Sequence, residues 1–282
     1  MTDLARPSKI GLALGGGGVR GLAHIGVLKR MEREGIPVSF LAGSSMGGLI
    51  AALYAAGWSG EQLEEEVLRM SRIHQLFKLV DVSRSRRGLL EGNRVRGYLR
   101  ELLEKDLTFD DLRIPLALTA VDLRTGCEVI LREGSLYDAI LATIAVPGLF
   151  SPVRKDNFLL VDGGVLNNVP ADVVRLMGAD VVVAVDVSPT FPMEIADESG
   201  MKGEDDIPSL FPGFAIGFYV AELIMVSALT QVRLREMQPD ILLRPSIPSN
   251  ISIFWGLTHA AEAIVAGEES VLLALPDLIS YI

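Results

Sequence analysis

The sequence predicts an α/β fold with a mostly parallel sheet. Short apolar runs, typical of buried strands, return repeatedly after segments of helix length. Glycine-rich turns join several of these runs to the next segment, as in folds that alternate strands and helices. The 282 residues are enough for one large core. We expect a single domain over residues 1–282, with the chemical motifs in residues 8–188 and a less clearly patterned part in 189–282.

Seven apolar runs qualify as strands because turn residues or helix-length segments bound them. The first runs directly into four glycines, the second into Gly-Ser-Ser and the fifth into Asp-Gly-Gly. In chain order, the predicted strands are residues 9–14, 38–42, 116–122, 128–131, 158–161, 181–187 and 241–243.

The segments between the strands have helical patterns. Ser59 and Gln62 form a capping-box pattern, and Gly35, Gly57 and Gly178 stand where C-terminal caps of helices occur. In chain order, the predicted helices are residues 21–33, 46–56, 60–70, 93–104, 136–145, 171–177, 214–237 and 257–274.

Composition excludes several classes of protein. Hydrophobic residues make up 49% and charged residues 22% of the chain, which is typical of a globular protein rather than a disordered or collagenous one. Cys127 is the single cysteine, and the first ten residues lack the apolar segment of a secretory signal, so we expect a cytoplasmic protein. The net charge of −10 argues against a nucleic-acid partner. The sequence does not specify an oligomeric state.

Three segments depart from the regular pattern. Residues 69–105 hold ten basic against four acidic residues, and such a stretch suits an anionic lipid surface or forms a solvated face. Residues 189–208 have the composition of a surface loop. The apolar run 214–229 contains Glu222 and is shorter than the roughly 20 residues of a spanning helix, so we expect a buried helix, with a membrane-surface helix as the alternative.

A glycine-rich turn follows the first predicted strand. Residues 15–18 and Gly21 are glycines that allow backbone N–H groups to approach an anionic group, with a helix N-terminus behind them. A dinucleotide fingerprint would need an acid at the end of the second strand, which instead ends in Ala-Gly-Ser at 42–44. A P-loop would need Gly-Lys-Ser/Thr where residues 19–20 are Val-Arg. We interpret the turn as an oxyanion hole, with a purely structural turn as the alternative.

The second predicted strand runs into a Gly-x-Ser-x-Gly pattern at residues 43–47. Ser45 would occupy a strained turn between strand and helix, where the small residues Gly43 and Gly47 relieve crowding. The following helix would direct its positive end at charge developing on a substrate oxygen. Ser45 is therefore the predicted nucleophile.

A serine nucleophile needs a base. Asp162 ends a short strand before Gly163 and Gly164, where it either caps a turn or serves a site, and we favour Asp162 as the base. His259 is the rival, because Ser45, an acid and His259 reproduce the chain order of α/β-hydrolase triads. A histidine base should lose activity as the pH falls through about 6 to 7, and an aspartate base should keep it to lower pH.

GGGGVRG at 15–21, GSSMG at 43–47 and DGG at 162–164 together resemble the patatin-like phospholipase family in identity, order and spacing. The resemblance implies a three-layer α/β/α patatin-like sandwich with a mostly parallel central sheet. Gly15 departs from the family, in which Asp is frequent there, and Thr143 stands where Ser is common. The resemblance implies these roles: nucleophile, Ser45; general base, Asp162; oxyanion hole, Gly16, Gly17 and Gly18; motif support, Arg20, Gly21, Gly43, Gly47, Gly163 and Gly164.

The resemblance further implies a serine hydrolase that cleaves fatty-acyl esters of lipids, of the phospholipase A or lysophospholipase type, through an acyl-enzyme and without a metal or other cofactor. The expected partner is a lipid or acyl-ester substrate, with peripheral membrane contact as a further expectation. The helix over 214–229, with Phe77 and Leu79, is a candidate lining or lid for an acyl slot, although for most of these residues we favour a place in the core. Two alternatives remain: an esterase that uses His259, and a non-catalytic lipid-binding or regulatory adaptor on the same fold.

Overall fold

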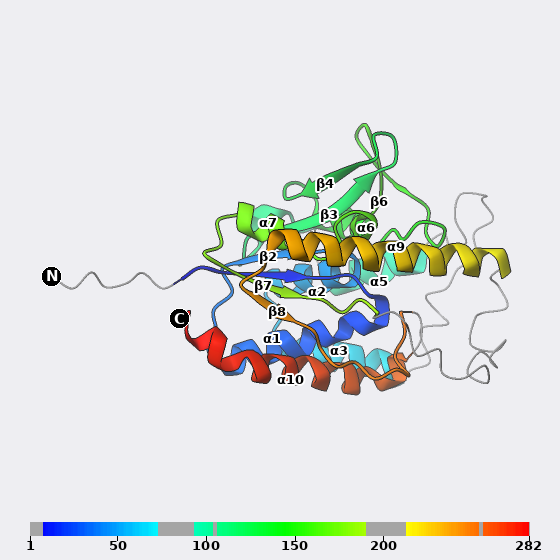
Figure 1. The fold of residues 1–282 in the computed structure, drawn as a ribbon. Coiled ribbons are helices and arrows are strands. Elements are labelled where there is room, and N and C mark those ends of the chain that lie inside the picture. Colours follow the sequence, from blue (N-terminus) through cyan, green and yellow to red (C-terminus); the bar gives the residue numbers. More distant parts are fainter. Residues whose placement is uncertain (1–7, 73–92, 104–105, 190–212, 254–255, 282) are drawn as a thin grey trace.

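The structure is a computed structural model, and it describes residues 8–72, 93–103, 106–189, 213–253 and 256–281. These residues form a central sheet of eight strands with helices on both faces (Figure 1). The strand order is β5-β6-β3-β2-β1-β7-β8, and β4 pairs with β3. The bounds are β1 Ile10–Leu14, β2 Phe40–Gly43, β3 Leu116–Asp122, β4 Cys127–Leu131, β5 Val153–Lys155, β6 Phe158–Asp162, β7 Val181–Val185 and β8 Ile241–Leu243.

The sheet is mostly parallel, which confirms the prediction. Strands β3, β2, β1, β7 and β8 run in one direction, whereas β4 and β6 pair antiparallel with β3 and β5 pairs antiparallel with β6. Every residue of β1, β3 and β7 is buried, because helices cover both faces of the parallel part. The carboxyl ends of β1, β2 and β7 consequently lie at one edge of the sheet.

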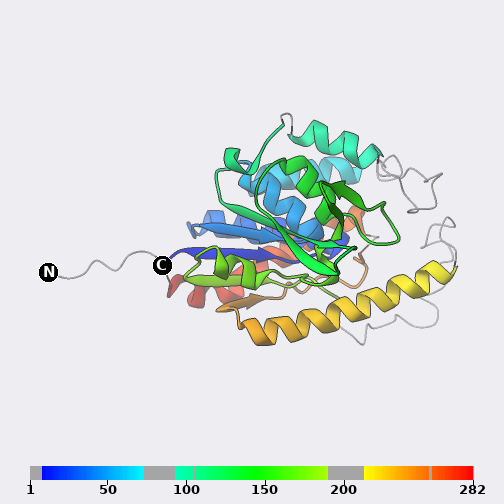
Figure 2. The ribbon, with the colours of Figure 1, turned by 90° about the horizontal axis from the view of Figure 1, so that it is seen from above.

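The two faces of the sheet have different cores. Leu12 of β1 belongs to a large core shared with α1, α2, α3, α6 and α10, while Ala13 belongs to a smaller core shared with α7 and with Leu234 of α9. This alternation follows from the two-residue repeat of a strand. Figure 2 shows α9 along one side of the molecule and α5 on the opposite side. The α-helices are α1 Ala23–Arg33, α2 Ser45–Ala55, α3 Gly60–Arg72, α5 Asn93–Leu103, α6 Leu136–Thr143, α7 Ala171–Leu176, α9 Gly213–Met237 and α10 Ala260–Ile279.

The structure differs from the predicted elements in three places. Strand β5 was not predicted, because three residues that include an Arg and a Lys give no apolar pattern. The helix predicted from residue 21 begins as a 3-10 turn over Gly18–Leu22 before α1. The last helix starts after a 3-10 turn, Leu257–His259, and continues past the predicted end through Pro276.

Several expectations fall on residues that the structure does not describe. These are most of the basic segment 69–105, the candidate slot residues Phe77 and Leu79, and the predicted loop beyond Pro189. All eight strands belong to one sheet, and the organisation of residues 1–282 as a single domain stays a prediction. In the described part of the chain, no helix is both long and apolar enough to span a membrane.

Candidate active site

Ser45 occupies a sharp turn between β2 and α2. It is the first residue of α2 and has a φ of 52°, a left-handed backbone conformation that non-glycine residues rarely adopt. Its backbone N–H donates to Thr143 Oγ1 at 3.0 Å, and this bond holds the turn in place. A strained backbone at this position is the geometry that the Gly-x-Ser-x-Gly pattern predicts.

Glycines allow the elements around Ser45 to approach one another. A Cβ on Gly47 would overlap the carbonyl oxygen of Leu14, so α2 can start against the end of β1 only with glycine there. A Cβ on Gly16 would lie 2.9 Å from Ser45 Cβ, which places the glycine turn directly against the serine. Gly43 likewise lies against the backbone of Gly48.

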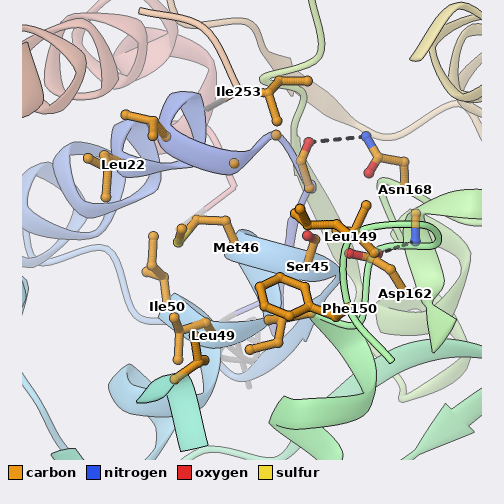
Figure 3. A pocket seen from close by; sticks show the side chains of 18 of the residues that line it. Leu22, Ser45, Met46, Leu49, Ile50, Leu149, Phe150, Asp162, Asn168 and Ile253 are labelled. Atoms are coloured by element: carbon orange, nitrogen blue, oxygen red, sulfur yellow. Dashed lines mark hydrogen bonds between the residues drawn. The ribbon is translucent and has the colours of Figure 1, made fainter. Parts of the chain in front are cut away.

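Asp162 ends β6 and lies beside Ser45, as Figure 3 shows. Its side chain is buried, and Oδ1 accepts hydrogen bonds from the N–H of Gly164 at 2.8 Å and from the Ser44 hydroxyl at 3.4 Å. Burial raises the pKa of Asp162 to about 6, although hydrogen bonds from Ser45, Gly164 and Ser44 lower it in part. A carboxylate with this pKa is a stronger base than an exposed aspartate and is still ionised at neutral pH.

The N–H groups of the glycine turn differ in their partners. Gly15 donates to Val185 O at 3.0 Å, and Gly16 donates to Asn168 O at 3.2 Å. Within the described residues, no acceptor pairs with the N–H of Gly17 or Gly18, and both glycines line the cavity that contains Ser45. The described part of the glycine turn therefore has two N–H groups without an acceptor at the cavity wall.

Asn168 and Arg20 fix the glycine turn to its neighbours. Asn168 Nδ2 donates to the carbonyl of Gly16 at 3.2 Å, drawn in Figure 3, and to the Ser188 hydroxyl at 3.1 Å. Arg20 donates from Nε to Val187 O at 2.9 Å, at the exit of β7. Arg20 thus points to backbone carbonyls and supports the turn.

Two histidines have very different surroundings. His24 is fully buried, and its Nε2 donates to Gly15 O at 2.6 Å; burial lowers its pKa to about 4, so the ring is neutral. His24 supports the glycine turn, a role that its place in a helical pattern did not reveal. The His259 side chain is 42% exposed, binds Glu262 through Nδ1 at 2.7 Å, and is not among the described residues that line the cavity.

An apolar cavity of about 410 Å³ opens from the serine. Ser45, Asp162 and the glycine turn contribute to its wall, together with apolar side chains from α2 and from the segment after α6 (Figure 3). The run 214–229 was predicted to be a buried helix, and this is wrong for its described part, because Val220, Ile224 and Met225 of α9 are exposed. Leu223 and Val226 of the same helix line the cavity. Labelled apolar side chains in Figure 3 are Leu22, Met46, Leu49, Ile50, Leu149, Phe150 and Ile253.

Glu222 of α9 is a further carboxylate at this cavity, besides Asp162 and Glu66. Burial and the neighbouring charge of Asp162 raise its pKa to about 7. Within the described residues, no group of three His, Cys, Asp or Glu side chains is arranged to hold a metal ion.

The fold and the site together define an α/β/α sandwich with a strained serine turn at the carboxyl edge of its sheet. A family model described as patatin-like phospholipase matches residues 12–175, and the chain belongs to that family. The predicted resemblance is confirmed.

Individual relatives agree with this membership. The human patatin-like phospholipase domain-containing protein 6 is 34% identical over 182 residues, which cover 63% of this chain and 13% of the relative. An NTE family protein of Mycobacterium tuberculosis is 35% identical over 182 residues, covering 64% of this chain and 49% of the relative. The chain thus matches about half or less of the length of these relatives.

A solved structure shows a similar fold. VipD from Legionella pneumophila superposes with a TM-score of 0.61 at 15% identity, over 97% of this chain and 67% of that one. This similarity concerns the fold, and the predicted patatin-like sandwich is confirmed.

Proposed function

We propose that this protein is a serine hydrolase that cleaves fatty-acyl esters of lipids, of the phospholipase A or lysophospholipase type. One observation carries the proposal: the Ser45 side chain, at a strained turn, is a hydrogen-bonding neighbour of the buried Asp162, and both residues line an apolar cavity. An apolar cavity suits an acyl chain, and a serine–carboxylate pair suits acyl transfer. Membership of the patatin-like phospholipase family supports the same assignment.

In the proposed mechanism, Asp162 accepts the proton of the Ser45 hydroxyl while Ser45 Oγ attacks the ester carbonyl. The N–H groups of Gly17 and Gly18, which have no acceptor among the described residues, donate to the oxyanion, and the N-terminus of α2 adds its positive end. Gly16, predicted as a third donor, contributes instead through the bond of its N–H to Asn168. The protonated Asp162 then donates to the leaving alcohol, and water releases the fatty acid from the acyl-enzyme.

The pKa of Asp162 changes how the base can be identified. With a pKa of about 6, an aspartate base loses activity in the same pH range as a histidine base. A pH profile alone therefore no longer separates Asp162 from His259, and substitution is the decisive test.

The test is a panel of lipid and simple esters, with released fatty acid as the readout. Ser45→Ala and Asp162→Asn should each lower kcat by at least about 100-fold, as expected for a nucleophile and a general base. A fluorophosphonate probe should label the wild type at Ser45 and leave Ser45→Ala unlabelled. Folded wild-type protein that neither takes up the probe nor releases fatty acid from any ester would instead support the adaptor function.

We further propose that α9 rests on a lipid surface. Val220, Ile224 and Met225 are exposed apolar side chains of this helix, whereas Leu223 and Val226 of the same turns line the cavity. A helix that is apolar both towards the cavity and towards solvent suits a position where acyl chains pass from a bilayer into the cavity.

Sedimentation with phosphatidylcholine vesicles tests this contact. Replacement of both Ile224 and Met225 by Glu should lower the bound fraction about ten-fold, because two apolar side chains no longer enter the bilayer. Leu273→Glu, a change at an 85% exposed leucine of α10, is the matched control and should bind like the wild type. Equal binding of all three proteins would refute the assigned surface.

A further inference from the structure

Two peptide groups carry the N–H groups of the proposed oxyanion hole, and they are held in different ways. The carbonyl of Gly17 accepts from the N–H of Arg20 at 3.1 Å, so the 3-10 turn itself holds the peptide that carries the Gly18 N–H. The carbonyl of Gly16, on the peptide that carries the Gly17 N–H, accepts instead from Asn168 Nδ2 at 3.2 Å (Figure 3). A side chain from a distant segment therefore holds the peptide between Gly16 and Gly17.

The bond from Asn168 also sets the direction of the Gly17 N–H. In a planar trans peptide, the C=O and the N–H point in opposite directions, so a partner that fixes the Gly16 carbonyl fixes the N–H as well. Glycine on both sides leaves this peptide free to rotate, because neither residue has a Cβ to block the motion. The Gly16 N–H donates to the backbone oxygen of Asn168 at 3.2 Å, and this second bond holds the preceding peptide. Loss of the side-chain amide would thus free the direction of the Gly17 N–H and leave Gly16 attached.

The Asn168 amide is itself fixed in place. The residue is 6% exposed, and Nδ2 also donates to the Ser188 hydroxyl at 3.1 Å, so both of its hydrogens have acceptors. A backbone carbonyl can only accept, so the NH2 group rather than the amide oxygen has to face Gly16. Asn168 follows Asp162 within one short segment, which therefore contains both the proposed base and the amide that holds the glycine peptide.

We propose that Asn168 is a positioning residue of the oxyanion hole: its side-chain amide orients the Gly16–Gly17 peptide so that the Gly17 N–H faces the oxygen that becomes negative when Ser45 attacks. The inference rests on the proposed ester hydrolase. A donor aimed at charge that develops during the reaction stabilises the transition state more than the bound ester. Loss of the Asn168 amide should therefore lower kcat and leave KM nearly unchanged.

A pair of ketones tests this role without any need for hydrolysis. With octyl trifluoromethyl ketone, Ser45 Oγ bonds to the ketone carbon, the hydroxyl proton moves to Asp162, and the ketone oxygen becomes an anion in the place of the ester oxyanion. Octyl methyl ketone has a less electrophilic carbonyl and occupies the cavity without this step. The wild type should bind the trifluoromethyl ketone at least about 100-fold more tightly, and Asn168→Leu should lower this ratio at least about ten-fold.

The same variant is compared with the wild type in the release of octanoate from octanoyl esters. Asn168→Leu should lower kcat about 10- to 100-fold, with KM within about two-fold of the wild type. Leucine has the branched shape of asparagine without its donors. If the leucine variant does not fold, Asn168→Ala takes its place, and both the ketone ratio and kcat should fall in the same way.

Asn167→Ala is the matched control. Asn167 is also buried, but its Nδ2 donates to Glu128 at 2.7 Å and to Asp172 at 2.9 Å, and it is not among the described residues that line the cavity. Its replacement should lower Tm and keep the ketone ratio and kcat of the wild type. The proposal is overturned if the Asn168 variants keep the wild-type ratio, if both ketones lose affinity equally, or if Asn167→Ala lowers the ratio as much.

Failure of the proposed function gives a different result. A wild type that selects the trifluoromethyl ketone through Asn168 and yet releases no fatty acid from any ester would refute the hydrolase and leave the positioning role standing. Release of fatty acid by a wild type whose ketone ratio does not depend on Asn168 would refute the positioning role alone.

Discussion

Replacement of Asp162 by Asn should abolish acyl release and yet stabilise the folded protein. In the folded state, burial raises the pKa of this carboxyl from 3.8 to about 6. The folded protein therefore holds this proton more tightly than the unfolded chain, and stability falls as the pH rises from 3.8 towards 6. Above pH 6 the full penalty of a buried carboxylate is present, and below 3.8 the penalty is absent.

The size of the effect follows from the shift. About two pKa units correspond to about 3 kcal/mol at pH 8, and Asn removes this penalty while its amide oxygen still accepts from Gly164. In a chain of this size, each kcal/mol changes Tm by about 2–4 °C. Thermal unfolding at pH 8 should thus show Asp162→Asn several degrees above the wild type, with the difference much reduced at pH 3.5.

Asp122 supplies a control of opposite sign. Its carboxylate accepts from Leu159 N and the Thr125 hydroxyl, both at 2.9 Å, and these bonds lower its pKa. Asp122→Asn should therefore destabilise the protein more at pH 8 than near pH 3, because the stabilising contribution is lost as the pH falls through the folded pKa. A stability change in Asp162→Asn that is unfavourable, or that does not vary with pH, would contradict the assignment of Asp162 as a desolvated base.

Three further substitutions test other parts of the site. Ser45→Gly should have a free energy of unfolding about 1 kcal/mol higher than Ser45→Ala, and so a higher Tm, because glycine accepts the φ of 52° without strain. Neither variant should release fatty acid. Thr143→Val removes the acceptor for the Ser45 N–H, so kcat should fall with little change in KM, and the free energy of unfolding should fall by about 1 kcal/mol. Thr143→Ser keeps the hydroxyl and should have the kcat and stability of the wild type. Equal kcat values for Thr143→Val and the wild type would refute this positioning role. His259→Asn should keep near-normal turnover, since this side chain binds Glu262 at the surface, and a loss of turnover comparable to that of Asp162→Asn would revive the triad.

Much of the fold follows from local patterns in the chain. Continuous apolar runs such as Val181–Val185 indicate strands that are buried on both faces, and such strands belong to parallel sheets. Where the pattern is short or mixed, prediction failed. Strand β5 has only three residues, and α10, which packs against α1, continues through Pro276, a residue type that usually ends a helix. Local propensity fixes the type of an element better than its ends.

For the site, the sequence supplies the residues with chemical roles and the structure supplies their partners. Glycines that flank a serine between a predicted strand and a predicted helix indicate a strained turn, because few other residues fit one. No local signal connects Thr143 to the Ser45 N–H or His24 to the Gly15 carbonyl, since these bonds join groups whose contact depends on how whole elements pack.

The sequence by itself determined the α/β class, the family, and the motifs that contain Ser45 and Asp162. Only the tertiary structure decided the electrostatics: it buried Asp162 enough to raise its pKa to about 6, left the N–H groups of Gly17 and Gly18 without a described acceptor, and placed Glu222 beside Asp162 in the cavity. The physical reason is that motifs record local backbone requirements, whereas desolvation and charge interaction depend on the atoms that distant segments bring together.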